Sequence, residues 1–209
     1  MKSLNFTSTN HLSSFLKNKR FNKIFVLCGK KSYRASGGKT ILEKFLKKKI
    51  VNFYYKTSPY PEIKELKRII FLLNKFEPDL IVAIGGGSVL DYAKIANVLK
   101  TSENIENDIK HSKFFIKKKI AKLIAIPTTA GSGAEVTSTA VIYIDGIKHS
   151  VENDLIVPDY FFLIPELIID STKKIKSSSG FDAIAQGIES IISAKSNDLS
   201  LKYAKKSDR

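Results

Sequence analysis

The sequence is short of cysteine, and it contains no long apolar run and no secretion signal. Cys28 is the only cysteine, so no disulfide can form within the chain, as is usual in a reducing compartment. Its place at the end of an apolar run predicts a small core residue. No apolar run approaches the roughly 20 residues that cross a bilayer, and residues 1–10 lack the basic-then-apolar order of a signal peptide. These shortages predict a cytoplasmic protein with no membrane partner.

Arginine is scarce as well, although the chain carries a formal net charge of +15. The basic residues are nearly all lysines in short scattered runs, such as Lys47–Lys49 and Lys117–Lys119. Arginine is the better residue for bidentate contacts to phosphates and bases, and no nucleic-acid-recognition motif accompanies the lysines. We therefore interpret them as a solvated surface and expect no nucleic-acid partner. Their field would still favour an anionic cofactor or substrate.

The chain alternates short apolar runs with amphipathic segments. This alternation predicts an α/β fold with a Rossmann-like parallel sheet, helices on both faces and right-handed crossovers. The expected strands are Ile24–Leu27, Val51–Tyr55, Leu80–Ile84, Leu123–Ile126 and Phe161–Ile164. The expected helices are about Lys39–Lys49, Glu62–Phe76 and Val89–Lys100, with a loop over Lys30–Gly38.

A β-hairpin is expected next, because Asp145-Gly146 separates two strand-like segments. They are Val136–Ile144 and Ile147–Val151. An Asp-Gly pair is typical of the type I′ turn, in which both central residues need a positive φ.

The last part of the chain has a helical pattern from Gly180 onward. Helices are expected over Phe181–Ser193 and Leu199–Lys206, with a polar break between them. We therefore expect two domains. Residues 1–172 would form a dinucleotide-binding α/β domain. Residues 173–209 would be the start of a truncated helical metal-binding domain, since they are too few to bury their own apolar face.

Gly85, Gly86, Gly87 and Ser88 stand between an expected strand and an expected helix, where open α/β sheets bind ligands. Glycines let the backbone approach a pyrophosphate, and the N–H groups at the positive end of the helix face the phosphate oxygens. Asp91, on the same face of the first turn, can cap backbone N–H groups or bond the nicotinamide side of a cofactor. The alternative is an ordinary tight strand-to-helix turn.

A second loop, rich in hydroxyl groups and glycine, follows the next expected strand. Thr128, Thr129 and Ser132 can donate to phosphates or to a carboxamide, and Gly131 and Gly133 keep the backbone accessible. The alternative for this loop alone is a helix cap or an ordinary polar loop. Two such loops after two strands of one sheet favour a dinucleotide site.

Four stretches of sequence resemble the iron-containing (group III) alcohol dehydrogenase family, in order along nearly the whole chain. They are GGGSVLD at Gly85–Asp91, PTTAGSGAEVT at Pro127–Thr137, VPDYFFLIPEL at Val157–Leu167 and GFDAIAQGIES at Gly180–Ser190. The first two look like the family's signature stretches, the third like the end of its nucleotide domain and the fourth like its first helical metal motif. The chain thus looks like the N-terminal part of such an enzyme. Glycerol dehydrogenases and dehydroquinate synthases are less similar in the threonine loop.

This resemblance implies a site for NAD or NADP. The implied cofactor-binding residues are Gly85, Gly86, Gly87, Ser88, Asp91, Thr128, Thr129, Ser132 and Lys148, of which Lys148 would face the ribose. Thr57 and Ser58, after the second expected strand, offer no carboxylate to repel a 2′-phosphate, so both cofactors stay open.

The resemblance also implies that Asp182 is a metal ligand, with Gln186 one helical turn later on the same side. Most of the family has histidine at the second position. Glutamine there, together with the tail SNDLSLKYAKKS at Ser196–Ser207, is similar to a phosphonoacetaldehyde reductase-like subgroup. Without the resemblance, Asp182 and Gln186 would be interpreted as a polar pair at a helix start.

The implied activity is metal-dependent hydride transfer between NAD(P) and an alcohol or aldehyde, anionic in that subgroup, with iron or zinc polarising the substrate oxygen. A catalytic metal takes about three protein ligands. His11, His111 and His149 all precede Asp182, so we expect the metal site to be incomplete in this chain. The alternatives are a catalytically inactive nucleotide-binding fragment and a basic interaction protein without a cofactor. No catalytic residue is assigned, and a homodimer is left open.

Overall fold

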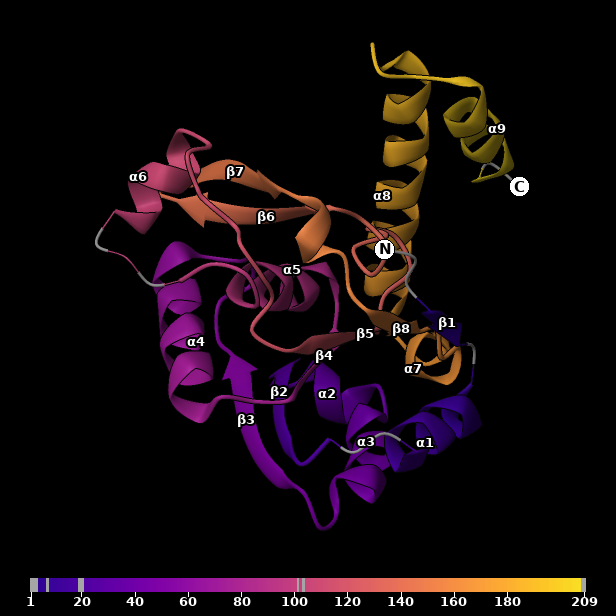
Figure 1. The fold of residues 1–209 in the computed structure, drawn as a ribbon. Coiled ribbons are helices and arrows are strands. Elements are labelled where there is room, and N and C mark those ends of the chain that lie inside the picture. The colour runs from indigo at the N-terminus through magenta and orange to yellow at the C-terminus, as the bar shows by residue number, and fades with distance from the viewer. Residues whose placement is uncertain (1–3, 7, 19–20, 101, 103, 208–209) are drawn as a thin grey trace.

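A computed structural model describes residues 4–6, 8–18, 21–100, 102 and 104–207. In this part of the chain, six strands form one parallel sheet in the order β1-β8-β5-β4-β2-β3 (Figure 1). Their bounds are β1 Leu4–Phe6, β2 Lys23–Gly29, β3 Ile50–Lys56, β4 Leu80–Gly85, β5 Lys122–Pro127 and β8 Tyr160–Phe162. The predicted Rossmann-like parallel sheet is confirmed.

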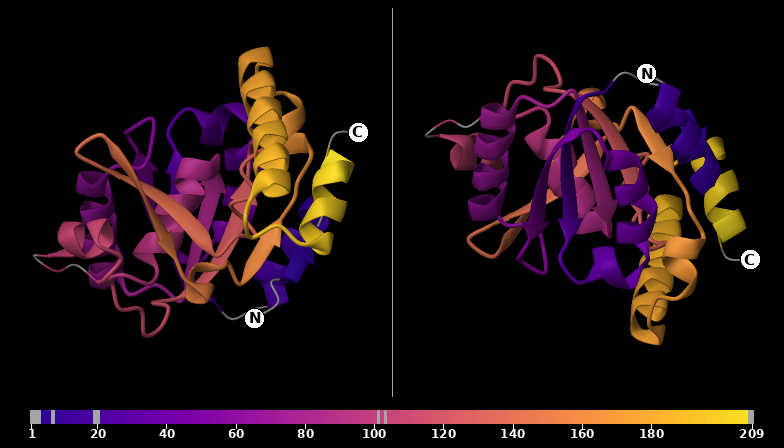
Figure 2. Two further views of the ribbon diagram at one scale, coloured as in Figure 1. Left: turned by 90° about the horizontal axis from the view of Figure 1, so that it is seen from above. Right: turned by 90° about the horizontal axis from the view of Figure 1, so that it is seen from below.

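Helices cover both faces of the sheet, because alternate residues of the central strands point to two separate apolar cores. In β2, Phe25 and Leu27 join one core, while Val26 and Cys28 join the other. The first core is closed by α4 (Ile63–Phe76) and α5 (Gly87–Ala96). The second is closed by α1 (Thr9–Asn18), α2 (Ser32–Ala35), α3 (Gly38–Leu46) and α7 (Glu166–Ile169) (Figure 2). Cys28 is buried, as predicted.

The hairpin of β6 (Thr139–Ile144) and β7 (Ile147–Glu152) is confirmed, and it lies on the outer side of α5 (Figure 1). Asp145 and Gly146 have φ of 53° and 78°, as a type I′ turn requires. Ala140, Ile142 and Ile144 point inward and are buried. Because α5 is enclosed between the sheet and this hairpin, its residues 92–96 are all buried, including the charged Lys94.

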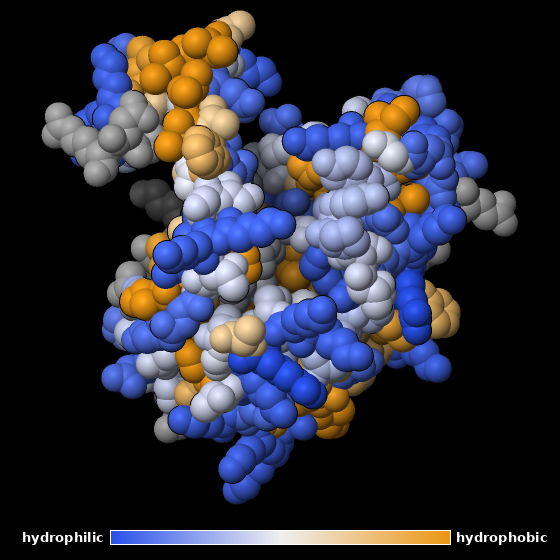
Figure 3. Space-filling view, turned by 180° about the vertical axis from the view of Figure 1, so that it is seen from behind, coloured by the Kyte–Doolittle hydropathy of each residue, from blue (hydrophilic) through white to orange (hydrophobic). Residues whose placement is uncertain are grey.

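The C-terminal segment consists of α8 (Lys173–Ile192) and α9 (Asp198–Ser207), which rise from one end of the sheet (Figure 1). No residue of α8 is buried. Large apolar side chains such as Phe181, Ile188 and Ile192 are exposed along α8. Apolar residues are visible on the protruding C-terminal segment in Figure 3. None of the helices in the described part of the chain has the length and apolar character needed to cross a membrane.

Some predicted boundaries were wrong. The helix expected from Phe181 begins at Lys173, because the Thr172 side chain caps it by accepting a hydrogen bond from the Ile175 N–H. The helix expected over Val89–Lys100 begins and ends earlier, at Gly87 and Ala96. The strand expected from Val136 begins only at Thr139.

Other short elements had no sequence prediction. The loop expected over Lys30–Gly38 contains α2, and the helix expected to reach Lys49 stops at Leu46. Helices α1, α6 (Ile105–Lys110) and α7, the 3-10 turn Asp154–Ile156 and strand β1 were not predicted. All of them except α1 have six residues or fewer, which is too short to show a clear periodicity.

Candidate nucleotide-binding site

The glycine turn and the threonine loop leave adjacent parallel strands at the same edge of the sheet. Gly85 of β4 is paired with Pro127 of β5. Directly after this pair, the Thr128 N–H donates a hydrogen bond to the Gly85 carbonyl oxygen, 2.9 Å away. This is the carboxyl edge of the sheet, where ligands bind in open α/β folds.

The two turns touch one another. A Cβ atom built on Gly87 would lie 3.0 Å from Ser132 Oγ, and one built on Gly86 would lie 3.4 Å from Thr129 Oγ1. The turns that carry Ser88 and Ser132 therefore meet at one edge of the sheet. A side chain at position 87 would crowd the Ser132 hydroxyl, which would have to shift by a few tenths of an ångström to admit even a Cβ atom.

The N-terminus of α5 points its unsatisfied N–H groups at this junction. Gly86 is the N-cap residue, and no side chain among the described residues caps the helix. The first N–H groups of a helix have no partner within it, and they carry the positive end of the helix dipole. An uncapped helix end beside two hydroxyl-bearing loops can accept phosphate oxygens.

Asp91 is turned toward the hairpin. Its carboxylate accepts a hydrogen bond from the Val141 N–H of β6. Burial raises the pKa of Asp91 to about 6, and the positive charges of Lys94 and Lys148 act in the opposite direction. The Asp91 carboxylate does not cap the N-terminus of α5, and its expected bond to the nicotinamide side of a cofactor stays a prediction. Lys148 lies exposed on β7, near enough to Asp91 to influence its charge.

The α8 helix lies directly against the threonine loop. A Cβ atom on Gly131 would lie only 2.5 Å from the Ser179 carbonyl oxygen. Asp182 follows less than one helical turn later, and both Asp182 and Gln186 are exposed. The expected metal ligands thus lie on the helix that contacts the threonine loop, and their binding of a metal stays a prediction.

The described residues do not form a complete metal site by themselves. They contain no group of three or more His, Cys, Asp or Glu residues placed to hold a metal ion. Asp182 and Gln186, the expected ligands, would supply two oxygen atoms, whereas a catalytic metal takes about three protein ligands. His11 and His111 are exposed on the surface, and His149 lies on β7.

Lys94 is a site residue that the sequence interpretation missed. Its side chain is 0% exposed, and its Nζ donates to Ala134 O at 3.0 Å, Thr137 Oγ1 at 2.9 Å and Thr139 O at 2.6 Å. These acceptors belong to the end of the threonine loop and the start of β6. The available signal was a lysine among the apolar residues of a helix that is buried on every side.

Glu65 is a second residue that was missed. Its buried carboxylate accepts hydrogen bonds from the Thr57 N–H at 2.6 Å, the Ser58 N–H at 3.1 Å and the Tyr92 hydroxyl at 2.9 Å. Tyr54 and the Thr57 hydroxyl also donate to it. Burial alone raises the pKa of Glu65, but these hydrogen bonds outweigh burial and hold the pKa below its usual value. Glu65 thereby fixes the loop after β3.

Comparison with known proteins decides the family. The profile described as iron-containing alcohol dehydrogenase matches residues 5–165. The chain belongs to the iron-containing alcohol dehydrogenase family. The alcohol dehydrogenase of Thermococcus barophilus is 36% identical over 135 residues, which are 62% of this chain and 36% of that protein. The 1-propanol dehydrogenase PduQ of Citrobacter freundii is 30% identical over 158 residues, which are 75% of this chain and 39% of that protein.

Two solved structures share the fold. The iron-containing alcohol dehydrogenase from Thermococcus thioreducens is 26% identical with a TM-score of 0.83, over 98% of this chain and 56% of that one. The sulfoacetaldehyde reductase from Bifidobacterium kashiwanohense, in complex with NAD⁺, is 25% identical with a TM-score of 0.79, over 90% and 51%. The chain spans about half the length of these structures and well under half that of the curated relatives.

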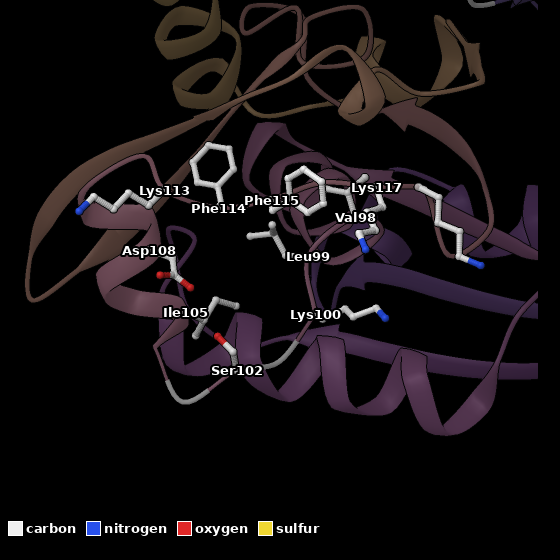
Figure 4. A pocket seen from close by; sticks show the side chains of 11 residues that line it. Val98, Leu99, Lys100, Ser102, Ile105, Asp108, Lys113, Phe114, Phe115 and Lys117 are labelled. Carbon is white, nitrogen blue, oxygen red and sulfur yellow. The ribbon is translucent and has the colours of Figure 1, made fainter.

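A cavity of about 520 Å³ lies away from the glycine turn and the threonine loop, beyond the C-terminal end of α5 (Figure 4). Leu99 and Phe114 lie at its centre, and the ammonium groups of Lys100 and Lys113 lie on opposite sides of it. The glycine turn is at the other end of α5, so this cavity is not part of the nucleotide site.

The close approach of α8 to Gly131 can be tested by substitution. Gly131→Ala is expected to loosen α8, because the new Cβ would meet the Ser179 backbone, which cannot rotate away. Amide hydrogen exchange over residues 173–186 should rise several-fold. Gly180→Ala is the matched control, since a Cβ there meets nothing within 4 Å. Equal exchange in the two variants would contradict the contact.

Proposed function

We propose that this chain binds NAD or NADP and is the nucleotide-binding part of a metal-dependent oxidoreductase that interconverts alcohols and aldehydes. The observation that supports this most is the contact between the glycine turn at Gly87 and the threonine loop at Ser132. Two flexible-backbone turns with free N–H groups and hydroxyls, meeting at a helix N-terminus, match the needs of a diphosphate.

Each candidate residue has a role in this proposal. The N–H groups of Gly86, Gly87 and Ser88 would bind the diphosphate, with Gly85 allowing the strand to enter the turn. The hydroxyls of Thr128, Thr129 and Ser132 would donate to phosphate or to the nicotinamide carboxamide. Asp91 would hold the hairpin so that Lys148 faces the ribose, since the two charges already influence each other.

The metal part of the proposal rests on Asp182 and Gln186. A bound divalent metal, iron or zinc, would polarise the substrate oxygen. The close approach of Ser179 to Gly131 supports this role, because Asp182 and Gln186 follow Ser179 on the helix that contacts the threonine loop. We keep the division into a nucleotide domain over residues 1–172 and a helical metal-binding segment over residues 173–209 as part of the proposal.

The substrate that we propose is an anionic aldehyde of the phosphonoacetaldehyde type. The net charge of +15 would favour an anion, and one structural relative is a reductase of sulfoacetaldehyde bound to NAD⁺. NAD and NADP both remain candidates. The Glu65 carboxylate beneath the loop after β3 is occupied by five donors, so it is not free to select between them. A homodimer is the proposed assembly.

Nucleotide binding is the first test. Titration with NADH and NADPH, followed by nucleotide fluorescence, should give saturable binding. Ser132→Ala should weaken it by about tenfold or more, because it removes a hydrogen bond to a charged group. Ser138→Ala, outside the contact between the turns, should leave it unchanged. Absence of binding to both nucleotides would contradict the proposal.

A second candidate is a nucleotide-binding protein without turnover, which the two-donor metal site favours. Aldehyde reduction, assayed with added Fe²⁺ or Zn²⁺, separates the two. We expect little or no turnover from residues 1–209 alone, because the described residues offer only Asp182 and Gln186 to a metal. Robust turnover would show that the metal site is complete without further ligands.

A further inference from the structure

One charged side chain connects the two halves of the proposed nucleotide site. Lys94 lies two turns along α5 from the glycine turn, and all three of its N–H donors are used by the segment that follows the threonine loop. Between Pro127 and Thr139 the chain belongs to no helix or strand. The course of this segment therefore depends on bonds such as these.

Packing alone does not explain why a lysine stands at position 94. Removing an ammonium group from water costs free energy, and a methionine would occupy a similar volume without that cost. What methionine cannot supply is three hydrogen bonds to Ala134, Thr137 and Thr139. These bonds span residues 134–139 and fix the distal end of the loop that carries Ser132 against the helix that begins at Gly87.

The surroundings of Lys94 lower its pKa into a range that binding experiments can reach. Burial is the largest influence and lowers the pKa of Lys94 to about 8, while Asp91 on α5 and Glu135 in the loop favour the charged form. Lys148 on β7 faces Asp91, and β6 contributes only the Thr139 carbonyl. A neutral amine donates at most two hydrogen bonds, so one of the three acceptors would lose its partner above this pH.

We propose that the Lys94 ammonium is a positioning group that holds the Ser132 turn against the Gly87 turn, so that nucleotide binding requires Lys94 to be protonated. This inference rests on the proposed function, which it extends by a form of regulation. It concerns the order of the loop before any nucleotide arrives, and it can be measured separately from binding.

The first measurement is amide hydrogen exchange of residues 132–139 without nucleotide. Lys94→Met should raise the exchange rate in this segment by about tenfold, while β2 and α4 keep their protection. Lys100→Met, at an exposed lysine four residues after the end of α5, is the matched control. Thr137→Val, which removes one acceptor at an exposed position, should give a smaller increase and serves if Lys94→Met does not fold.

The second measurement is the pH dependence of the NADH dissociation constant between pH 7 and 9.5, above the range where Asp91 titrates. If only the protonated form binds, wild-type affinity should fall about tenfold from pH 7 to 9. Lys94→Met should bind at least about tenfold more weakly at pH 7 and show no such slope. Loss of fold does not explain the slope: a lysine whose pKa is lowered on folding makes the native state more stable as pH rises from 8 toward 10.5.

The outcomes separate the two proposals. Wild-type protein that binds no nucleotide at any pH would overturn the proposed function and, with it, this role of Lys94. Wild-type protein that binds NADH with a flat pH profile would overturn only the role of Lys94. The same holds if Lys94→Met matches the wild type in exchange and affinity.

Discussion

Replacing Gly87 with valine is expected to weaken NADH binding by at least about 100-fold, equivalent to about 2.7 kcal/mol. Even a Cβ at this position would lie 3.0 Å from Ser132 Oγ and 3.2 Å from Ser132 Cβ. The two further methyl groups of valine would project into the junction where phosphate oxygens are proposed to lie, or push the two turns apart. Fluorescence titration with NADH measures the loss directly.

Two further variants make this result specific. Gly180→Val is the control, because it places the same side chain at an open position in α8 and should leave affinity unchanged. Gly87→Ala should fall between the wild type and Gly87→Val, since the Ser132 hydroxyl must shift by a few tenths of an ångström to admit one methyl group. Full affinity in Gly87→Val, with the fold verified by circular dichroism, would remove the main support for the nucleotide site.

Replacing Glu65 with leucine should cause the largest loss of stability, about 3–5 kcal/mol. Leucine fits the space but accepts no hydrogen bond, so the buried Tyr54 and Tyr92 hydroxyls and the N–H groups of Thr57 and Ser58 would lose their acceptor. Urea-induced unfolding measures the change. Glu106→Gln is the control, because its ion pair with Lys67 is partly exposed and such pairs contribute at most about 1 kcal/mol.

The pH dependence of stability gives an independent check on Glu65. The pKa of Glu65 in the folded protein lies below the ordinary value of 4.5. The native state therefore favours the charged carboxylate more than the unfolded chain does. The resulting stabilisation is present above pH 4.5 and is lost as the pH falls through the folded-state pKa. Glu65→Gln should therefore lose stability at pH 7, and its difference from the wild type should narrow below pH 4. A constant difference from pH 7 to 3 would contradict this account.

These residues together show how α5 organises the candidate site. Its N-terminus at Gly87 meets the threonine loop, Tyr92 holds Glu65 and through it the loop after β3, and Lys94 holds the segment before β6. Asp91 binds the hairpin. Every loop of the site is thus attached to one helix, which is enclosed between the sheet and the hairpin.

Family membership and the main elements were predictable from local pattern. Apolar runs specified β2, β4 and β5 because an inner strand of a parallel sheet is buried on both faces. The edge strand β3 is only partly buried, and its apolar and aromatic residues specified it. Asp145-Gly146 specified the hairpin turn because few residues adopt positive φ. The glycine turn and threonine loop were recognisable for the same reason: their residue types are tied to backbone conformation. Strand β1 and helix α6 are short, and their own sequences carry too little periodicity to predict them.

The roles of Lys94 and Glu65 came only from the folded arrangement. In the sequence each is one charged residue on an expected helix, where a solvated position is the default. The hydrogen-bond acceptors of Lys94 lie 40 or more residues away in the sequence. The donors to Glu65 include the hydroxyl of Tyr92 on a neighbouring helix. Local sequence patterns specify which backbone conformations cost little free energy. Burial of a charged side chain depends instead on which distant segments pack against it. For Lys94 that segment is the hairpin, which packs onto α5.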